Sequence, residues 1–127
     1  MSTTSVYPAE DTVFAKKMRG RDVGMSMRDS TELIHRYVPD YTVRRTSGAF
    51  AAAGWCNYKK KIISLPRDAG LPYVLHELAH ALAREHGHGL AFQNAYIDLV
   101  AKEMSPWWAR RLRASFIKHK TKGYKSL

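Results

Sequence analysis

Two histidines and a glutamate stand close together in the segment His76-Glu77-Leu78-Ala79-His80. Imidazole nitrogens are common zinc ligands, and the H-E-x-x-H order on a helix places a carboxylate beside them. Helical positions four residues apart differ by about 40° around the axis and by about 6 Å along it. Both imidazoles can therefore bind one cation, while Glu77 takes a proton from water as a base. The pattern predicts a zinc-dependent hydrolase.

A third ligand is expected because catalytic zinc sites commonly combine three protein ligands with one open position for water. His86 and His88 both follow the motif. The spacing from His76 to His86 is that of the longer metzincin motif, although Ala83 stands where that motif has glycine. His88 follows Gly87, at which the chain can turn back. We favour His88 as the third ligand and keep His86 as the alternative.

The segment that carries the motif is predicted to be a helix over residues 71–85. Its apolar residues recur at helical spacing, a proline suits its first turn, and a glycine follows its end. The apolar stripe consists of Leu71, Val74, Leu75, Leu78 and Leu82. On a helical projection of this segment, His76 and His80 lie on the side opposite the apolar stripe, so we expect them to face away from the core.

The rest of the chain predicts an α+β domain around this helix. Apolar periodicity and capping residues predict further helices over residues 9–19, 29–37 and 89–104, and from Ser105-Pro106 onward. Three β-like runs cover residues 41–46, 50–58 and 61–65, with turns at Ser47-Gly48 and at 57–60. We expect an antiparallel meander whose third strand lies at the edge, because Pro66 stops it.

Length and composition indicate one domain over residues 1–127, with a flexible basic tail from about residue 119. Cys56 is the single cysteine, so the chain can form neither an internal disulfide nor a cysteine zinc site. We interpret Cys56 as a buried neutral thiol. The sequence contains no secretory signal and no membrane-spanning segment. We therefore predict a cytoplasmic protein with no membrane partner.

Basic residues are concentrated at the C-terminal end. The net charge is +10, and residues 102–127 hold eight basic residues and one acidic residue. Such an end can bind phosphates of DNA, although it can equally be a solvated basic face. The candidate nucleic-acid contacts are Arg110, Arg111, Arg113, Lys118, Lys120 and Lys122. Trp108, Leu112 and Phe116 recur at helical spacing and are expected to belong to the core.

The motif, together with His88-Gly89-Leu90-Ala91-Phe92, resembles the SprT-like zinc metallopeptidases. The start of the chain, residues 6–11, is similar to that of a small group of metallohydrolases from actinobacteria and their phages. The likeness spans roughly residues 6–104 and implies a zincin-like fold. It also implies zinc on His76, His80 and His88, Glu77 as the base, and a protein or peptide substrate. A phage protein of this kind would act in the host cytoplasm.

Two features depart from that family. Longer relatives often add a cysteine-rich zinc ribbon, which a chain with one cysteine cannot form, and Leu90 replaces a common proline. Resemblance to zincins also implies that the third β-like run borders the cleft, where it could receive an extended peptide by strand addition.

Three functions remain in competition. The first is a zinc metallopeptidase that acts on DNA-associated proteins. The second is a zinc-dependent nuclease, because the spacing His76-x3-His80-x5-His86 resembles that of the YbeY-type RNA hydrolases. The third is a non-catalytic, zinc-containing DNA-binding protein. Glu77 favours the peptidase. The sequence does not select the group that stabilises an oxyanion among Tyr73, Tyr96, Arg84 and His86.

Overall fold

A computed structural model of the protein describes residues 6–46 and 53–119. Five α-helices, one short 3-10 helix and three strands make up this part of the chain, which is α+β as predicted. In chain order they are α1 (Val6–Phe14), η1 (Ala15–Lys17), α2 (Met27–Tyr37), β1 (Thr42–Arg45), β2 (Trp55–Asn57), β3 (Ile62–Leu65), α3 (Leu71–Ala83), α4 (Leu90–Glu103) and α5 (Pro106–Lys118). The turn predicted at Ser47-Gly48 and the tail predicted beyond residue 119 lie outside the described residues.

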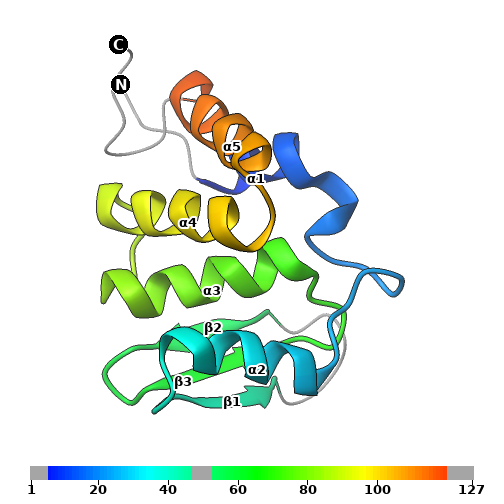
Figure 1. Cartoon of the computed structure of the whole chain (residues 1–127), viewed down its shortest axis with the longest axis vertical. Helices are drawn as coiled ribbons and strands as arrows, with labels where there is room; N and C mark the ends of the chain where they lie inside the picture. Colours follow the sequence, from blue (N-terminus) through cyan, green and yellow to red (C-terminus); the bar gives the residue numbers. More distant parts are fainter. Residues whose placement is uncertain (1–5, 47–52, 120–127) are drawn as a thin grey trace.

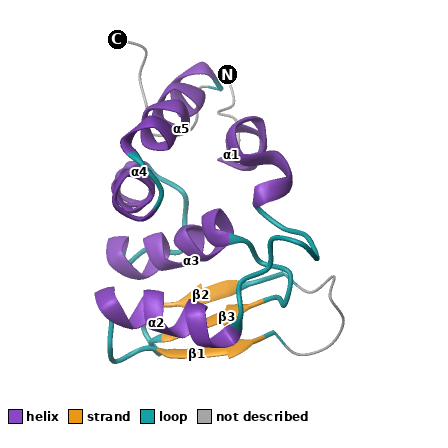
Figure 2. Ribbon diagram, turned by 45° about the vertical axis from the view of Figure 1, so that its right-hand side comes forward, coloured by secondary structure: helices purple, strands orange, loops and turns teal. Residues whose placement is uncertain are grey.

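The sheet lies at one end of the molecule, and α1 and α5 lie at the other (Figure 1). Between these ends, α3 packs against β2 and β3 on one side and against α4 on the other. Figure 2 shows the same order of layers, with α2 beside the sheet and α4 between α3 and α5. Helix α3 therefore lies in the middle of the fold.

The central position of α3 buries nearly all of its sides, not one stripe. Leu75 and Leu78 are fully buried, but His76 and His80 are also only 5% and 6% exposed. The prediction that the two histidines face away from the core is wrong, because Phe92 of α4 packs against both rings. Leu82, which was predicted to be part of the core stripe, is 40% exposed in the last turn.

The sheet does not have the predicted topology. Its strand order is β1-β3-β2, with β3 antiparallel to β2 and parallel to β1. The antiparallel meander and the edge position of the third strand are therefore wrong, although the hairpin from β2 to β3 was predicted. Pro66 follows the last residue of β3 and removes no hydrogen bond within the strand. Because Ile63 and Leu65 are fully buried, the central position in the sheet keeps the apolar side chains of β3 out of water.

Local capping explains where several helices begin. Helix α2 starts earlier than predicted, because the Ser26 hydroxyl accepts a hydrogen bond from the Asp29 amide at 3.0 Å. Helix α5 starts at Pro106 as predicted, with the Ser105 hydroxyl as its N-terminal cap. Its Leu112 and Phe116 are fully buried, as expected for core residues. No helix in the described ranges has the length and apolar composition of a membrane span.

Candidate metal centre

Three histidines converge between α3 and the loop that follows it. His88 Nε2 lies 3.2 Å from His80 Nε2 and 3.2 Å from His76 Nε2. One ligand nitrogen from each ring lies within 4.8 Å of the others, so the three residues could hold a metal ion. His86 is not part of this group, because its ring packs against Tyr58 with a centroid distance of 4.7 Å. The structure thus brings together His88, rather than His86, with the motif histidines.

The loop after α3 is shaped so that His88 returns to the helix. Helix α3 ends at Ala83, two residues earlier than predicted, and Arg84 adopts a left-handed conformation with φ of 55°. The Glu85 carboxylate then accepts a hydrogen bond from the Phe92 amide at 2.9 Å. The Gln93 side chain donates to the His88 carbonyl oxygen at 2.7 Å. These contacts attach both ends of the loop to the start of α4.

Each motif histidine is oriented through the ring nitrogen that faces away from the cluster. His76 Nδ1 lies 2.7 Å from Glu10 Oε2, and His80 Nδ1 lies 2.9 Å from the Glu85 carbonyl oxygen. A carbonyl or carboxylate oxygen accepts hydrogen bonds, so each Nδ1 carries the proton. In the neutral form of each ring, the Nε2 lone pair of His76 or His80 consequently points toward His88. This arrangement is typical of imidazoles that bind metal.

The environment keeps two of the three imidazoles neutral. Burial, followed by the nearby charge of His76, lowers the pKa of His80 and of His88 to about 4 in each case. For His76, burial alone lowers the pKa, but the charge and hydrogen bond of Glu10 and the charge of Glu77 outweigh it. The pKa of His76 is therefore raised. At neutral pH a metal ion would meet at most one protonated imidazole.

Glu77 lies beside His76 on α3 and is only 6% exposed. Burial raises the pKa of Glu77 to about 7; His76 opposes the shift and Glu10 adds to it. Cys56 lies on the neighbouring strand β2. Burial, with a smaller contribution from Glu77, raises the pKa of the Cys56 thiol to about 12. Cys56 is therefore the buried neutral thiol that was predicted.

Glu10 is a residue of the candidate site that was not predicted from the sequence. It lies on α1, is 1% exposed, and accepts hydrogen bonds from His76 and from the Tyr96 hydroxyl, each at 2.7 Å. A signal was present, because Glu10 is a carboxylate within the otherwise apolar buried face of α1. An acid at such a position needs a buried partner. Asp98, a carboxylate of α4 ten residues after His88, is exposed and paired with Lys102, so it orients none of the three histidines.

The candidates for oxyanion stabilisation differ in their surroundings. The Tyr96 hydroxyl is buried against Glu10 Oε2 and lies 3.1 Å from the Pro72 carbonyl oxygen. The Arg84 guanidinium lies 5.8 Å from the Tyr58 ring, on which His86 also packs. Outside the predicted set, the Tyr7 ring lies 5.9 Å from the His76 ring and 5.3 Å from the His88 ring. Tyr7 therefore flanks two of the three candidate ligands.

With Zn²⁺ as the probe ion, replacing Glu10 by glutamine is expected to lower the metal affinity at pH 8 about 10- to 100-fold, because orienting carboxylates contribute about this much. Glutamine also removes the negative charge that raises the pKa of His76. The pH below which affinity declines should therefore move to a lower value in the variant. Competition titrations with a zinc chelator over a pH series measure both effects. The control is Asp98→Asn, which neutralises an exposed carboxylate of α4. Equal affinities for all three proteins would contradict the role of Glu10.

The predicted nucleic-acid residues do not join the metal centre. Arg110, Arg111, Arg113 and Lys118 are exposed on α5, while Lys120 and Lys122 lie outside the described residues. The arrangement near α3 can hold a cation through three imidazoles and places the carboxylate of Glu77 next to one of them in sequence.

Comparison of the chain with protein-family models, with curated proteins and with solved structures finds no match.

Proposed function

We propose that the protein is a zinc-dependent hydrolase of the metallopeptidase type, with a zincin-like fold. The observation that carries the proposal is the convergence of three imidazole nitrogens within 4.8 Å, two of them from the helix that also bears Glu77. A set of three histidines leaves a tetrahedral metal ion one position for water, as catalytic zinc sites require. Glu77 gives that site a base.

The donor atoms fit zinc. Imidazole nitrogens bind zinc at about 2.0–2.1 Å, so a tetrahedral ion holds them about 3.3 Å apart. The Nε2 separations of 3.2 Å to His88 are close to this value. The hydrogen bonds that His76 and His80 donate to Glu10 and to the Glu85 carbonyl oxygen fix the two rings. His76, His80 and His88 would hold the ion.

The protein residues would divide the chemistry between them. When bound, zinc supplies Lewis-acid chemistry that makes water more acidic and polarises a carbonyl group. Glu77 takes the proton from the attacking water and delivers it to the leaving amine. Burial raises its pKa to about 7, and a bound cation would lower that value again, so Glu77 would be a base near neutral pH. Glu10 keeps His76 oriented throughout.

We propose that strand β2, rather than β3, receives an extended peptide. Strand β3 has a strand partner on each side, so it cannot accept another. Within residues 6–46 and 53–119, strand β2 pairs with β3 along one edge and has no strand on the other, and it packs against α3. Just before β2, the Gly54 amide donates a hydrogen bond to the Tyr73 hydroxyl at 2.6 Å. A peptide added to the outer edge of β2 would therefore run beside the helix of Glu77.

The nuclease alternative has less support. The spacing that favoured it uses His86 as a ligand, whereas the His86 ring packs against Tyr58, apart from the other two histidines. The non-catalytic alternative retains the same zinc site but assigns no role to Glu77. A cleavage assay with zinc-loaded protein and denatured protein substrates tests the peptidase directly. Zinc-dependent formation of new peptide ends supports the peptidase. In a parallel assay with RNA, cleavage of the RNA while the protein substrates stay intact supports the nuclease.

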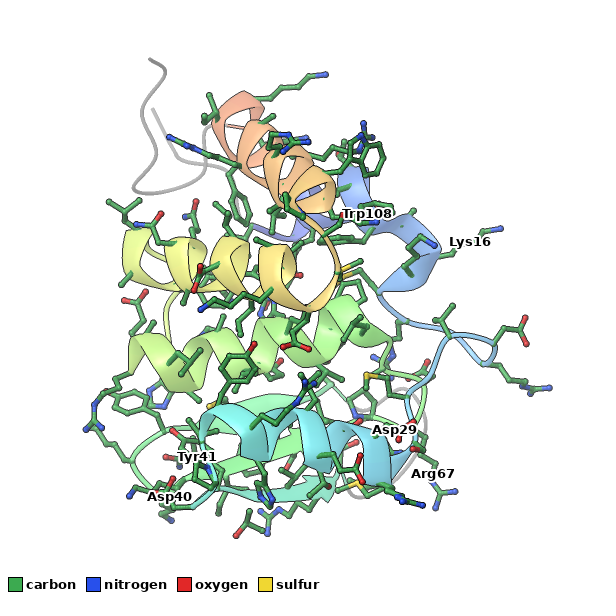
Figure 3. All side chains as sticks on the ribbon, in the orientation of Figure 1. Lys16, Asp29, Asp40, Tyr41, Arg67 and Trp108 are labelled. Atoms are coloured by element: carbon green, nitrogen blue, oxygen red, sulfur yellow. The ribbon has the colours of Figure 1, made fainter. Side chains whose placement is uncertain are left out.

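We further propose that the exposed face of α5 binds DNA and brings the peptidase to DNA-associated proteins. This face carries four basic residues and, within Pro106–Lys118, no acidic one. Trp107 is 51% exposed, and the Arg111 guanidinium lies 4.8 Å from its ring centroid, a combination that can also stack on a base. Trp108, unlike Trp107, packs against Phe14. The exposed side chain of Lys16 extends from the same end of the molecule as α5 (Figure 3).

Reversing the charge of Arg110, Arg111 and Arg113 to glutamate is expected to weaken DNA binding and to flatten its salt dependence. Each phosphate contact contributes about 0.9 to the slope of log affinity against log salt, so the loss of three contacts lowers the slope by up to about 2.7. Fluorescence anisotropy at several salt concentrations measures this slope, and zinc content reports folding. A control variant reverses two charges elsewhere, at Lys59 and Lys60, exposed lysines of the β2–β3 turn. If both variants bind DNA like the parent protein, α5 is only a solvated face.

A further inference from the structure

A cleft of about 530 Å³ lies beside the metal centre, bordered by α1, by the chain that follows it and by the first turn of α3. Two of its lining residues also contact a candidate metal ligand. The Tyr7 ring stacks on the His76 ring, and Glu10 holds His76 Nδ1. A third lining residue, Tyr73, lies one helical turn before Glu77 and so on the same side of α3. The cleft therefore shares two of its lining residues, Tyr7 and Glu10, with the surroundings of His76.

The walls of the cleft are mainly apolar. Tyr7 and Tyr73 present aromatic rings, Pro8 a pyrrolidine ring and Met18 a thioether. Such surfaces bind apolar and aromatic groups, which lose their contact with water there. The volume is within the range of pockets that enclose small organic groups. These walls could therefore hold one large side chain.

Contacts outside the cleft hold its walls in place. The Tyr73 hydroxyl accepts a hydrogen bond from Gly54, and the Arg19 guanidinium lies 5.9 Å from the Tyr73 ring. Arg19 itself forms an ion pair with Asp68 at 2.7 Å. The Met18 sulfur lies 3.8 Å from the Tyr96 hydroxyl, on the side of the core. The cleft is thus built before a ligand enters it, which favours selective binding.

The charges around the cleft disfavour an acidic ligand. Asp11 is exposed among the lining residues, and Glu10 Oε1 is buried with no hydrogen-bond partner within the described residues. Arg19, the basic residue of the lining, already has Asp68 as its partner. A carboxylate entering the cleft would therefore meet carboxylates without gaining an uncompensated cation. Apolar walls with an acidic border select against acidic side chains.

We infer that this cleft binds the side chain of a residue that flanks the scissile peptide bond, and that it selects a large apolar or aromatic side chain over an acidic one. The inference rests on the proposed peptidase function, which it extends to a substrate class: unfolded or extended protein segments with exposed aromatic or large aliphatic residues. Such residues are buried in most folded proteins, so the cleft would direct the enzyme toward unfolded segments.

The experiment uses zinc-loaded Glu77→Gln protein and blocked alanine-rich heptapeptides that differ only in a central Phe or Glu. The Phe peptide is expected to bind at least about tenfold more tightly, because burying one aromatic side chain is worth about this factor. Tyr7→Ala should remove most of the preference. Leu82→Ala, which truncates an exposed apolar side chain that does not line the cleft, should leave the preference unchanged. Asp11→Lys should improve binding of the Glu peptide.

Equal affinities for the two peptides, or a preference that persists in Tyr7→Ala, would overturn the inference. Cleavage of the same peptides by the parent protein separates the two proposals. If the Phe peptide is preferred in binding but neither peptide is cleaved, the peptidase function fails while the binding cleft stands. If peptides are cleaved at bonds not flanked by Phe, the peptidase stands and the assignment of the cleft is wrong.

Discussion

His88→Ala is expected to lose its zinc on dialysis, whereas His86→Ala is expected to keep one zinc ion per chain. Each variant removes one imidazole, and the two positions lie two residues apart in one loop. Only the His88 ring meets the motif histidines, with Nε2 separations of 3.2 Å. If three ligands share even about 10 kcal/mol of binding free energy, losing one lowers the affinity by about 3 kcal/mol, more than 100-fold.

His76→Ala and His80→Ala should lose zinc as completely as His88→Ala. Elemental analysis after dialysis and titration against a chelator of known affinity measure occupancy and affinity. Because both side chains are buried, circular dichroism is needed to show that the apo variants remain folded. Zinc that is retained in His88→Ala but lost in His86→Ala would restore the metzincin-like or nuclease-like spacing. Zinc content unchanged in all four variants would refute the metal centre.

Glu77→Gln is expected to keep its zinc and to lose about 100- to 10,000-fold in kcat. General bases contribute this much, and glutamine preserves the shape of the side chain while removing its basicity. If the proposed activity is present, the parent protein should lose it as the pH falls through the pKa of Glu77, because only the carboxylate accepts a proton. Burial places that pKa near 7, and a bound cation shifts it lower. The acidic limb of the rate profile should therefore lie at or below pH 7.

Cleavage rates over a pH series, together with zinc content, test this role. The control is Glu32→Gln, which makes the same change at an exposed residue of α2 that pairs with Arg28. Full turnover by Glu77→Gln would assign the base to another residue. A parent protein that binds zinc and cleaves neither peptide nor RNA would identify the site as non-catalytic.

The sequence determined those features that depend on neighbouring residues. Apolar periodicity located the five α-helices of the described residues, although α1 spans Val6–Phe14 and not the predicted residues 9–19. The capping signal of Ser105-Pro106 located the start of α5 to the residue. The motif histidines share one side of a helix because a spacing of four residues is a local property of helical geometry. His88 could be favoured over His86 because a glycine allows the chain to turn there, although the sequence left both open.

Only the tertiary structure decided how the elements pack around the motif. The pairing of β1 with β3 joins residues about 20 positions apart, and nothing in either strand alone specifies it. The histidines are buried because α4 packs over them, which a helical projection of α3 cannot show. Glu10 is 66 positions from His76 and meets it only when α1 folds against the rest of the chain. Local periodicity therefore predicted the helices and the motif, while contacts between distant residues determined the orientation, burial and protonation of the site.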